Sequence, residues 1–281
     1  MLAPVVYENL IDQALLEDLA GGDITTEATV EQGVLACANA VARRPLVVCG
    51  GDIFLATFRR VDPSVVCELL VRDGEKVEAA TTLWRVRGAA RSLLAAERVA
   101  LNFVQRMSGV ATLTRAYVDA IPKACDTRIT DTRKTTPGLR VLERYAVRAG
   151  GGFNHRDCLG SAVLIKDNHL VAAGGIAAAM KRARAHAPHT TRIELEVDTL
   201  DQLDEAIDEG ADIIMLDNFS IEDTKTAVAR AKGKALLEVS GGITLDRIAQ
   251  LACLGIDVIS VGALTHSAKA VDIGLDMVLL P

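Results

Sequence analysis

The chain has 281 residues, of which 31 are Lys or Arg and 37 are Asp or Glu, giving a formal net charge of −6. With half of its residues hydrophobic, it has the composition of a globular protein of one or two domains, which excludes a disordered or collagen-like chain. No apolar run approaches the roughly 18 residues of a membrane span, and 3% aromatic content argues against stacking on single-stranded nucleic acid. We therefore expect neither a membrane nor a nucleic-acid partner.

Charge is distributed unevenly along the chain. Residues 1–42 contain no Lys or Arg, and because export and mitochondrial leaders need basic residues, we expect no leader and a cytoplasmic protein. Residues 123–166, by contrast, carry nine basic and four acidic residues. Solvated helix faces account for most such charges. A basic segment in an acidic protein nevertheless favours a site for a small anion over one for a polyanion.

The N-terminal part of the chain predicts a small antiparallel sheet followed by a long helix. Strand-like segments at 65–71 and 82–86 flank a polar turn at 72–76. The helical pattern covers about 89–107 and resumes after Ser108-Gly109 up to Ala120. Arg98 shares helical spacing with Leu94 and Leu101, which predicts that it lies in the apolar stripe. A buried arginine needs an anion, either an acid in a structural ion pair or a ligand.

From residue 128 onward, β-branched runs alternate with helical patterns, as in a parallel sheet with crossover helices. Each run ends in polar or glycine-rich sequence. In a (β/α) barrel these ends meet on one rim, whereas in an open sheet the outer ones would lie apart. We therefore expect an α/β fold with an incomplete (β/α) barrel, since six strands are predicted and not eight. The predicted strands are 128–134, 162–169, 192–198, 212–219, 235–242 and 258–264, and the predicted helices are 138–149, 175–187, 200–209, 221–231 and 245–254.

Basic side chains follow the first two predicted barrel strands. Arg133 and Lys134 end the first strand, His155 and Arg156 follow a run of three glycines, and Lys166 ends the second strand. Arginine grips a carboxylate through two parallel hydrogen bonds, whereas lysine acts as a point charge. So many cations at one rim require a ligand of high negative charge, such as a dicarboxylate, a polyphosphate, or both.

Acidic and glycine-rich sequence follows the later strands. Glu196 and Asp217 could hold Mg²⁺ together with substrate phosphates, or could accept hydrogen bonds from ribose hydroxyls; structural ion pairing is the alternative. Ser240-Gly241-Gly242 and Val261-Gly262-Ala263 precede predicted helix starts, where backbone N–H groups bind phosphate. A zinc site is not expected, because the six cysteines form no CxxC motif and the histidines form no ligand pair on a helix.

Taken together, these segments resemble one family, the nicotinate-nucleotide pyrophosphorylases (carboxylating), also called quinolinate phosphoribosyltransferases. The resemblance runs from about residue 10 to Met277. Cys158 stands where a glycine is usual in that family, and Gly160-Ser161 replaces the usual acid. The segments that carry the resemblance are 16–19, 22–26, 97–98 with 101–103, 108–112, 131–138, 154–156, 164–169, 217–219, 240–242 and 262–267.

The resemblance implies a reaction and a domain organisation. Quinolinate would react with 5-phosphoribosyl 1-diphosphate (PRPP) in the presence of Mg²⁺ to give nicotinate mononucleotide, CO₂ and diphosphate, as a step of NAD biosynthesis. It implies an open-faced α/β sandwich domain of residues 1–109, on which a tail of residues 267–281 packs, and a barrel domain of residues 110–266. It also implies a homodimer, in which Arg98 reaches the active site of the neighbouring subunit, and leaves open whether dimers assemble further.

The resemblance also assigns roles to individual residues. Lys134, Lys166, Glu196 and Asp217 are the expected catalytic residues, with Glu196 and Asp217 as the expected metal ligands. The quinolinate carboxylates would be held by Arg98, Arg133, His155, Arg156 and Lys166. PRPP and its metal would be served by Lys134, Glu196, Asp217, Ser240, Gly241, Gly262 and His266, and the expected substrate site further includes Thr132, Gly242, Val261 and Ala263.

Three other functions remain open on the residues alone. A molybdenum-transport-associated relative of the same fold shares the Asp131–Lys134 and glycine segments, but it typically diverges at Lys166 and Asn168. A Schiff-base lyase would use Lys166, because lysines at barrel strand ends form imines. A non-enzymatic anion-binding protein would bind the ligands without releasing diphosphate.

Overall fold

The computed structural model describes residues 2–281, which divide into two compact units. The first unit contains the described residues up to Arg115, together with Thr136–Gly151 and Ser267–Pro281. The second unit contains Ala116–Thr135 and Gly152–His266. None of the described helices is long and apolar enough to cross a membrane.

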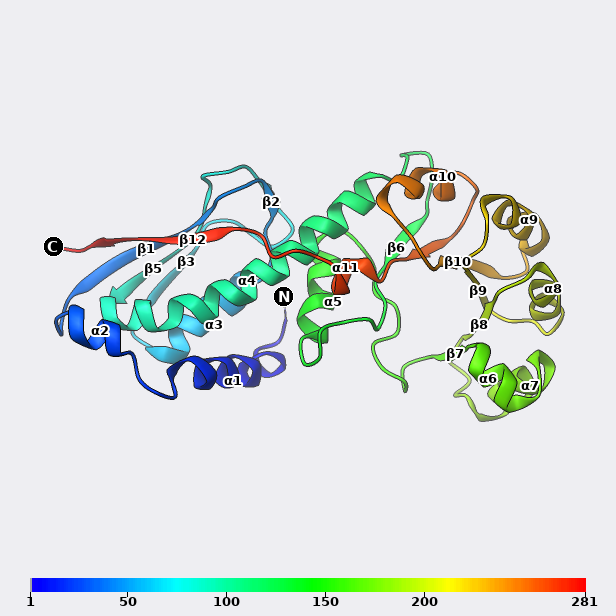
Figure 1. The fold of residues 1–281 in the computed structure, drawn as a ribbon, viewed down its shortest axis with the longest axis horizontal. Helices are drawn as coiled ribbons and strands as arrows, with labels where there is room; N and C mark the ends of the chain where they lie inside the picture. Colours follow the sequence, from blue (N-terminus) through cyan, green and yellow to red (C-terminus); the bar gives the residue numbers. More distant parts are fainter. Residues whose placement is uncertain (1) are drawn as a thin grey trace. The chain divides into compact units, whose positions relative to one another are not determined.

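The first unit is built on an antiparallel sheet with strand order β12-β1-β5-β3 (Figure 1). Its last strand in sequence, β12, pairs with β1 along its length, so the end of the chain completes the sheet. A separate ribbon pairs β2 with β4. The elements of this unit are η1 (Pro4–Val6), α1 (Glu8–Leu19), α2 (Ile24–Thr29), β1 (Leu35–Ala42), β2 (Leu46–Val47), α3 (Gly51–Val61), β3 (Val66–Leu69), β4 (Lys76–Val77), β5 (Thr82–Ala89), most of α4 (Ala90–Asp119), α5 (Arg140–Ala149) and β12 (Ile273–Leu279).

One face of this sheet is covered by helices α3 and α4, and the other carries polar side chains. The covered face includes four alanines of β1 at alternate positions, 36, 38, 40 and 42, each fully buried. Small side chains there let the helices approach closely enough for Phe54 of α3 to pack on Trp84 of β5, with ring centroids 4.8 Å apart. On the opposite face Arg85 donates to Asn39 and to Glu68. Burial on a single face is the pattern of an open-faced sandwich.

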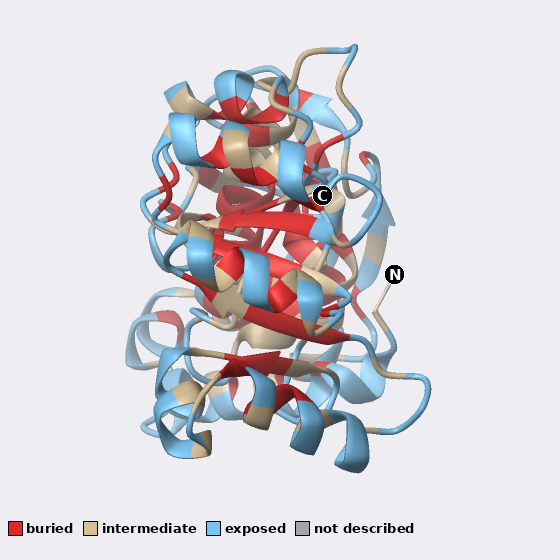
Figure 2. Cartoon of the chain, turned by 90° about the vertical axis from the view of Figure 1, so that its right-hand side faces the viewer, coloured by how far each residue is buried: buried red, intermediate tan, exposed pale blue. Residues whose placement is uncertain are grey.

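The second unit is built on a sheet of six parallel strands, in the order β6-β11-β10-β9-β8-β7. In a closed barrel β6 and β7, which follow each other in sequence, would be paired neighbours. Here they stand at the two ends of the order, so the sheet is an incomplete barrel, and the predicted α/β fold class is confirmed. Figure 2 shows its helices buried toward the strands and exposed outward. The elements are β6 (Arg128–Thr130), β7 (Val163–Ile165), α6 (Asp167–Ala173), α7 (Ile176–His186), β8 (Ile193–Val197), α8 (Leu200–Asp208), β9 (Ile213–Asp217), α9 (Ile221–Ala231), β10 (Leu236–Ser240), η2 (Leu245–Arg247), α10 (Ile248–Ala252), β11 (Val258–Ser260) and α11 (Ala263–His266).

Each predicted barrel strand exists, but all six are shorter than the sequence predicted, the first two and the last most of all. The pattern 162–169 contains both the end of β7 and the start of α6, because Lys166 is the extended N-cap residue of that helix. Likewise, β11 ends at Ser260 and α11 begins at Ala263. Val261 continues the apolar pattern past β11, and the polar residues after β7 form a helix start, so composition alone places both boundaries too late.

Residues 136–151 belong to the first unit, whereas the sequence assigned them to the barrel domain. Within the first unit, Tyr145 of α5 donates a hydrogen bond to Asp73, and Gly150 packs against the backbone of Ala111. The division at Arg115 falls inside α4, which runs unbroken through Ser108-Gly109. The alternation of strand and helix patterns in the sequence does not reveal that one of these helices, α5, packs within the first unit and not in the second.

The prediction that Arg98 lies in the buried stripe of α4 is wrong. Arg98 is exposed, and the fully buried side chains in this part of the helix include those of Leu93, Ala96, Ala100 and Val104. The alanines at positions 96 and 100 allow α4 to pack against the alanine-rich strand β1. Of the two leucines that suggested the stripe, Leu101 is buried in the core and Leu94 is half-buried, so the buried face of the helix lies to one side of Arg98.

Close packing between α4 and the C-terminal segment requires glycine at position 109. A Cβ atom added there would lie 2.1 Å from the carbonyl oxygen of Lys269, which cannot move without displacing the backbone that leads into β12. We expect Gly109→Ala to lower the free energy of unfolding by about 1–3 kcal/mol or more, as overpacking does. Chemical denaturation monitored by circular dichroism measures the change. Gly21→Ala is the control, since nothing lies within 4 Å of its Cβ position, and equal stabilities of the two variants would contradict this packing argument.

Candidate active site

The polar ends of the parallel strands line a cavity of about 550 Å³ in the second unit. Side chains two positions apart on a strand point to the same face, so the strands contribute inward-facing pairs such as Glu194 and Glu196 on β8, and Glu238 and Ser240 on β10. On each of these strands, the alternation places the polar residue at the strand end toward the cavity. Of the residues predicted for the site, the cavity is lined by Thr132, Arg133, Lys134, His155, Arg156, Lys166, Glu196, Asp217, Ser240 and Gly241.

A buried aspartate fixes the loop that carries His155 and Arg156. Asp131 follows β6 and is fully buried. Its carboxylate accepts the backbone N–H of His155 at 2.7 Å and the side-chain amide of Asn154 at 2.6 Å. Phe153, just before, pairs with Thr130 of β6 in an isolated bridge. These contacts hold a loop that is distant in sequence against the end of β6, beside Arg133 and Lys134.

Lys166 is positioned by a helix start and by an acid on the next strand. Its backbone N–H donates to Nδ1 of His169 at 2.9 Å, and the backbone N–H of His169 donates to the carbonyl oxygen of Lys166 at 2.8 Å at the start of α6. Its ammonium group forms an ion pair with Glu196 of the adjacent strand β8. Lys166, the last of the predicted cations, is thus in direct contact with Glu196, the first of the predicted acids.

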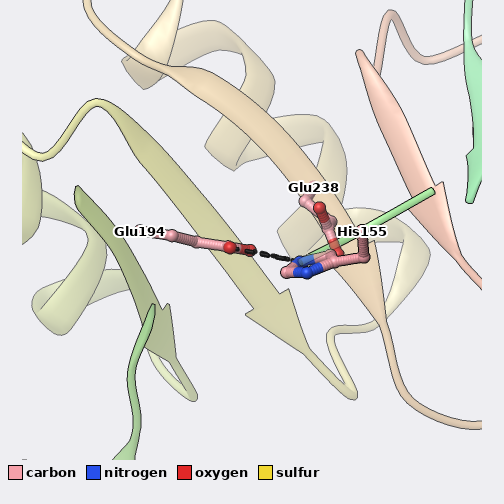
Figure 3. Close-up of side chains that lie close together, drawn as sticks. All are labelled: His155, Glu194 and Glu238. Carbon is pink, nitrogen blue, oxygen red and sulfur yellow. Dashed lines mark hydrogen bonds and ion pairs between the residues drawn. The ribbon is translucent and has the colours of Figure 1, made fainter. Parts of the chain in front are cut away.

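Two buried glutamates lie beneath the cavity, on either side of β9. Glu194 is 4% exposed and Glu238 is 3% exposed, and both face the imidazole of His155 (Figure 3). Nε2 of His155 lies 3.1 Å from Oε2 of Glu194 and 3.5 Å from Oε1 of Glu238. Within the part of the chain that is described, these three side chains are the group close enough to share a metal ion.

Burial and neighbouring charge shift the pKa values of this cluster. Burial, reinforced by the charge of Glu194, raises the pKa of Glu238 to about 7, although His155 opposes the shift. Burial lowers the pKa of His155, but the hydrogen bond to Glu194 and the charges of Glu238 and Glu194 outweigh it, so the net pKa is raised. Burial also lowers the pKa of Arg156, and Arg133 adds to this effect.

Another part of the cavity wall is formed by Asp217 and glycine-rich backbone. Asp217 accepts a hydrogen bond from the amide of Asn218 at 2.8 Å. Gly241 has a φ of +87°, and a Cβ atom there would lie 2.2 Å from Oδ1 of Asn218, so a side chain does not fit. This close approach leaves the Asp217 carboxylate and the Ser240-Gly241 backbone together at the cavity wall.

Some of the predicted site residues lie outside the cavity lining. Gly262 and His266 are nonetheless near it, because a Cβ atom at Gly262 would lie 3.1 Å from Cδ of Lys134 and 3.2 Å from the ring of His266. Arg98 is an exposed residue of the first unit. The predicted residues that do not line the cavity are Arg98, Gly242, Val261, Gly262, Ala263 and His266.

Sequence reasoning missed both the apolar part of the lining and the buried acids. The signal for Glu194 and Glu238 was present, since each is an acid two positions before a polar strand end in an otherwise apolar strand. Period-two alternation places such residues directly beneath the rim. The lining residues that were not predicted are Leu159, Leu164, His169, Met215 and Ser260.

Comparison with known proteins gives one consistent similarity. Residues 23–108 match the family described as "Quinolinate phosphoribosyl transferase, N-terminal domain", and residues 110–276 match its C-terminal domain. The chain is 47% identical over 273 residues to nicotinate-nucleotide pyrophosphorylase [carboxylating] of Mycobacterium leprae, covering 95% of each chain. It is 39% identical to the human protein of the same name, covering 99% of this chain and 93% of that one.

Solved structures agree with these sequence matches. The crystal structure of NadC from Streptococcus pyogenes superposes with a TM-score of 0.96 at 38% identity, over 100% of this chain and 99% of the other. The nicotinate-nucleotide pyrophosphorylase from Francisella tularensis superposes with a TM-score of 0.93 at 41% identity, over 99% and 98% of the two chains. The similarity therefore extends through both units.

Burial of Glu238 should make stability depend on pH. Its pKa of about 7 lies above the 4.5 of an exposed glutamate, so the folded state binds more protons than the unfolded state between these values. Stability is then lost as pH rises through this window. We expect Glu238→Gln to gain stability relative to the parent protein between pH 5 and pH 8, by up to a few kcal/mol, since one pKa unit corresponds to about 1.4 kcal/mol. Thermal unfolding at both pH values measures this, and a stability difference that is the same at pH 5 and pH 8 would contradict it.

Proposed function

The chain belongs to the quinolinate phosphoribosyl transferase family, and we propose that the cavity at the ends of the parallel strands is where its reaction takes place. The protein is a pentosyltransferase of NAD biosynthesis, which transfers the phosphoribosyl group of PRPP to quinolinate with decarboxylation. The single observation that supports the cavity as the site is the convergence of Arg133, Lys134, Arg156 and Lys166 on it from separate segments.

Quinolinate fits the side of the cavity that is lined by Arg133, Arg156 and Lys166. The acceptor carries two adjacent carboxylates, and two guanidinium groups with one ammonium group match that charge with bidentate and point-charge contacts. Repulsion between Arg133 and Arg156, which contributes to the lowered pKa of Arg156, is relieved when an anion lies between them. A monocarboxylate would relieve less of this repulsion, which is the physical basis for selecting the diacid.

PRPP fits the part of the cavity that presents Lys134, Asp217 and the Ser240-Gly241 backbone. Exposed backbone N–H groups and a lysine suit phosphate, and carboxylates suit ribose hydroxyls. Glu196 and Asp217 offer carboxylate oxygens, the donors that Mg²⁺ prefers, so these two residues would hold the ion. When bound, Mg²⁺ would neutralise charge on the diphosphate leaving group.

The cavity's own residues account for the remaining requirements of the reaction. As the diphosphate departs, positive charge develops on the ribose carbon, and Glu196 or Asp217 can stabilise it electrostatically. The pyridine nitrogen attacks that carbon and becomes cationic. Loss of the adjacent carboxylate then leaves a carbanion beside the ring nitrogen, which the ammonium group of Lys166 can stabilise or protonate.

Replacing Lys166 tests this assignment. Lys166→Ala should reduce turnover of quinolinate with PRPP and Mg²⁺ by about 10²- to 10⁴-fold, the range expected for loss of an acid–base group, while leaving the fold intact. Diphosphate release measures turnover, and circular dichroism verifies folding. Lys225→Ala, an exposed lysine of α9, is the matched control.

Two further arms separate the proposal from its rivals. Nicotinic acid as acceptor should support little turnover in the parent protein, because it lacks the second carboxylate. Borohydride trapping with a carbonyl substrate should not label Lys166. Turnover of Lys166→Ala near the parent rate would remove Lys166 from the mechanism, and covalent labelling would favour a Schiff-base lyase.

We also propose that the protein is a homodimer in which Arg98 completes the active site of the neighbouring subunit. Arg98 is exposed on α4, and it is not among the residues that line the cavity of its own chain. An exposed arginine in a two-fold dimer can contact the partner and receive the equivalent contact in return. This arrangement would add a third guanidinium group to the quinolinate side.

Mixing two inactive variants tests the shared site. Arg98→Ala and Lys166→Ala should each be inactive alone, because every site then lacks one residue. Dimers reassembled at random from both variants should recover about a quarter of the parent activity, since half of them are mixed and each mixed dimer has one intact site. Subunit exchange is verified with differently tagged chains. Failure of verified mixed dimers to recover activity would place Arg98 outside the partner's site.

A further inference from the structure

Two buried glutamates beneath the cavity take no part in the contacts proposed for either substrate. Glu194 and Glu238 come from β8 and β10 and converge on the imidazole of His155 (Figure 3). A buried carboxylate is costly unless it is paired and hydrogen-bonded. Two of them side by side repel each other, so their position calls for a partner that carries a proton between them.

Contacts at both ring nitrogens fix the tautomer of His155. Nδ1 accepts a hydrogen bond from the backbone N–H of Arg156 at 2.8 Å, so this nitrogen carries no proton. The ring proton therefore lies on Nε2, which faces Glu194 at 3.1 Å and Glu238 at 3.5 Å. The imidazole thus links the acid pair on one side to the main chain of Arg156 on the other.

The same contacts favour a proton over a metal ion at the centre of this cluster. A metal ion would take the lone pair of Nε2, which moves the ring proton to Nδ1. That proton would then point at the Arg156 N–H and replace an attractive contact by a repulsive one. Arg133 and Arg156 on the adjoining cavity wall would also repel a dication.

Arg156 depends on this arrangement for its position. Its backbone N–H is held by the His155 ring, and its Nη1 atom donates to the carbonyl oxygen of Ala162 at 3.1 Å. The backbone N–H of His155 is in turn held by Asp131. Rotation of the imidazole would break the contact at Nδ1 and release the main chain directly beneath the guanidinium group.

We propose that Glu194 and Glu238 are positioning residues, which hold His155 as the Nε2–H tautomer and thereby fix Arg156 for binding the acceptor carboxylates. This role rests on the proposed function of the cavity. Burial raises the pKa of Glu238 to about 7, which lowers the negative charge that it carries beside Glu194 and so reduces their mutual repulsion. Neither glutamate needs to touch the substrate, because its effect reaches the substrate through His155 and Arg156.

The tautomer can be measured without turnover. In the protein labelled with ¹⁵N-histidine, two-bond proton–nitrogen correlation spectra at neutral pH should show a protonated Nε2 and an unprotonated Nδ1 for His155, assigned with His155→Gln. Glu194→Gln should keep this pattern, because its amide oxygen still accepts the Nε2 proton. Glu194→Leu should lose it and give a mixture of tautomers. Glu222→Gln, an exposed acid of α9, should leave the spectrum unchanged.

Kinetics separate positioning from general destabilisation. Glu194→Leu should raise KM for quinolinate about tenfold, as loss of one charge-assisted hydrogen bond does, with kcat and KM for PRPP changed by less than about threefold. Glu194→Gln and Glu238→Gln should keep most of the parent protein's affinity for quinolinate, and Glu222→Gln should match the parent protein. If Glu194→Leu does not fold, the spectrum of the parent protein and the two glutamine variants still decide the outcome.

Several results would overturn the proposal. One is a protonated Nδ1 in the parent protein, and another is a divalent metal bound stoichiometrically at an unprotonated Nε2. A third is an unchanged tautomer and unchanged KM in a folded Glu194→Leu variant. Absence of turnover in the parent protein would instead count against the proposed function, because the tautomer measurement requires no substrate.

Discussion

Balancing positive charge inside a low-dielectric barrel is the constraint on which the site depends. Arg133, Arg156 and Lys166 line one cavity, and unopposed they would repel one another strongly. Acidic side chains on the strands balance part of this positive charge. Glu196 pairs with Lys166, while Glu194 and Glu238 lie one layer deeper, with His155 between them and the arginine-bearing loop. Part of the counter-charge is therefore built into the sheet, and the carboxylates of the ligand supply the rest.

The layering of the strands makes this possible. Alternate residues of β8 and β10 face inward, so the polar rim and the acid layer beneath it belong to the same faces of the same strands. The rim acids remain accessible to a substrate, whereas the deeper acids are buried and can act only on protein groups. Two acids only two residues apart on one strand can therefore have different roles: the outer one can contact the substrate, and the inner one can only position other side chains.

Long-range backbone contacts give the cavity its shape. Asp131 holds a loop more than twenty residues later in sequence, and the approach of Gly241 to Asn218 leaves no space for a side chain. In the first unit, glycine at 109 and alanines along β1 serve a similar purpose, because they let backbone elements approach where larger side chains would keep them apart. In both units the smallest residues determine which segments can come together.

The sequence by itself determined the succession of strands and helices, the parallel sheet, and most of the residues that line the cavity, because these follow from local periodicity and from polar residues at strand ends. It did not determine which side of α4 is buried, the packing of α5 with the first unit, or the pairing of Glu194 and Glu238 with His155. Those features depend on contacts between residues far apart in the chain. Arg98 illustrates the difference, since its helical spacing was read correctly while the face of the helix that packs on the sheet was decided by alanines on another strand.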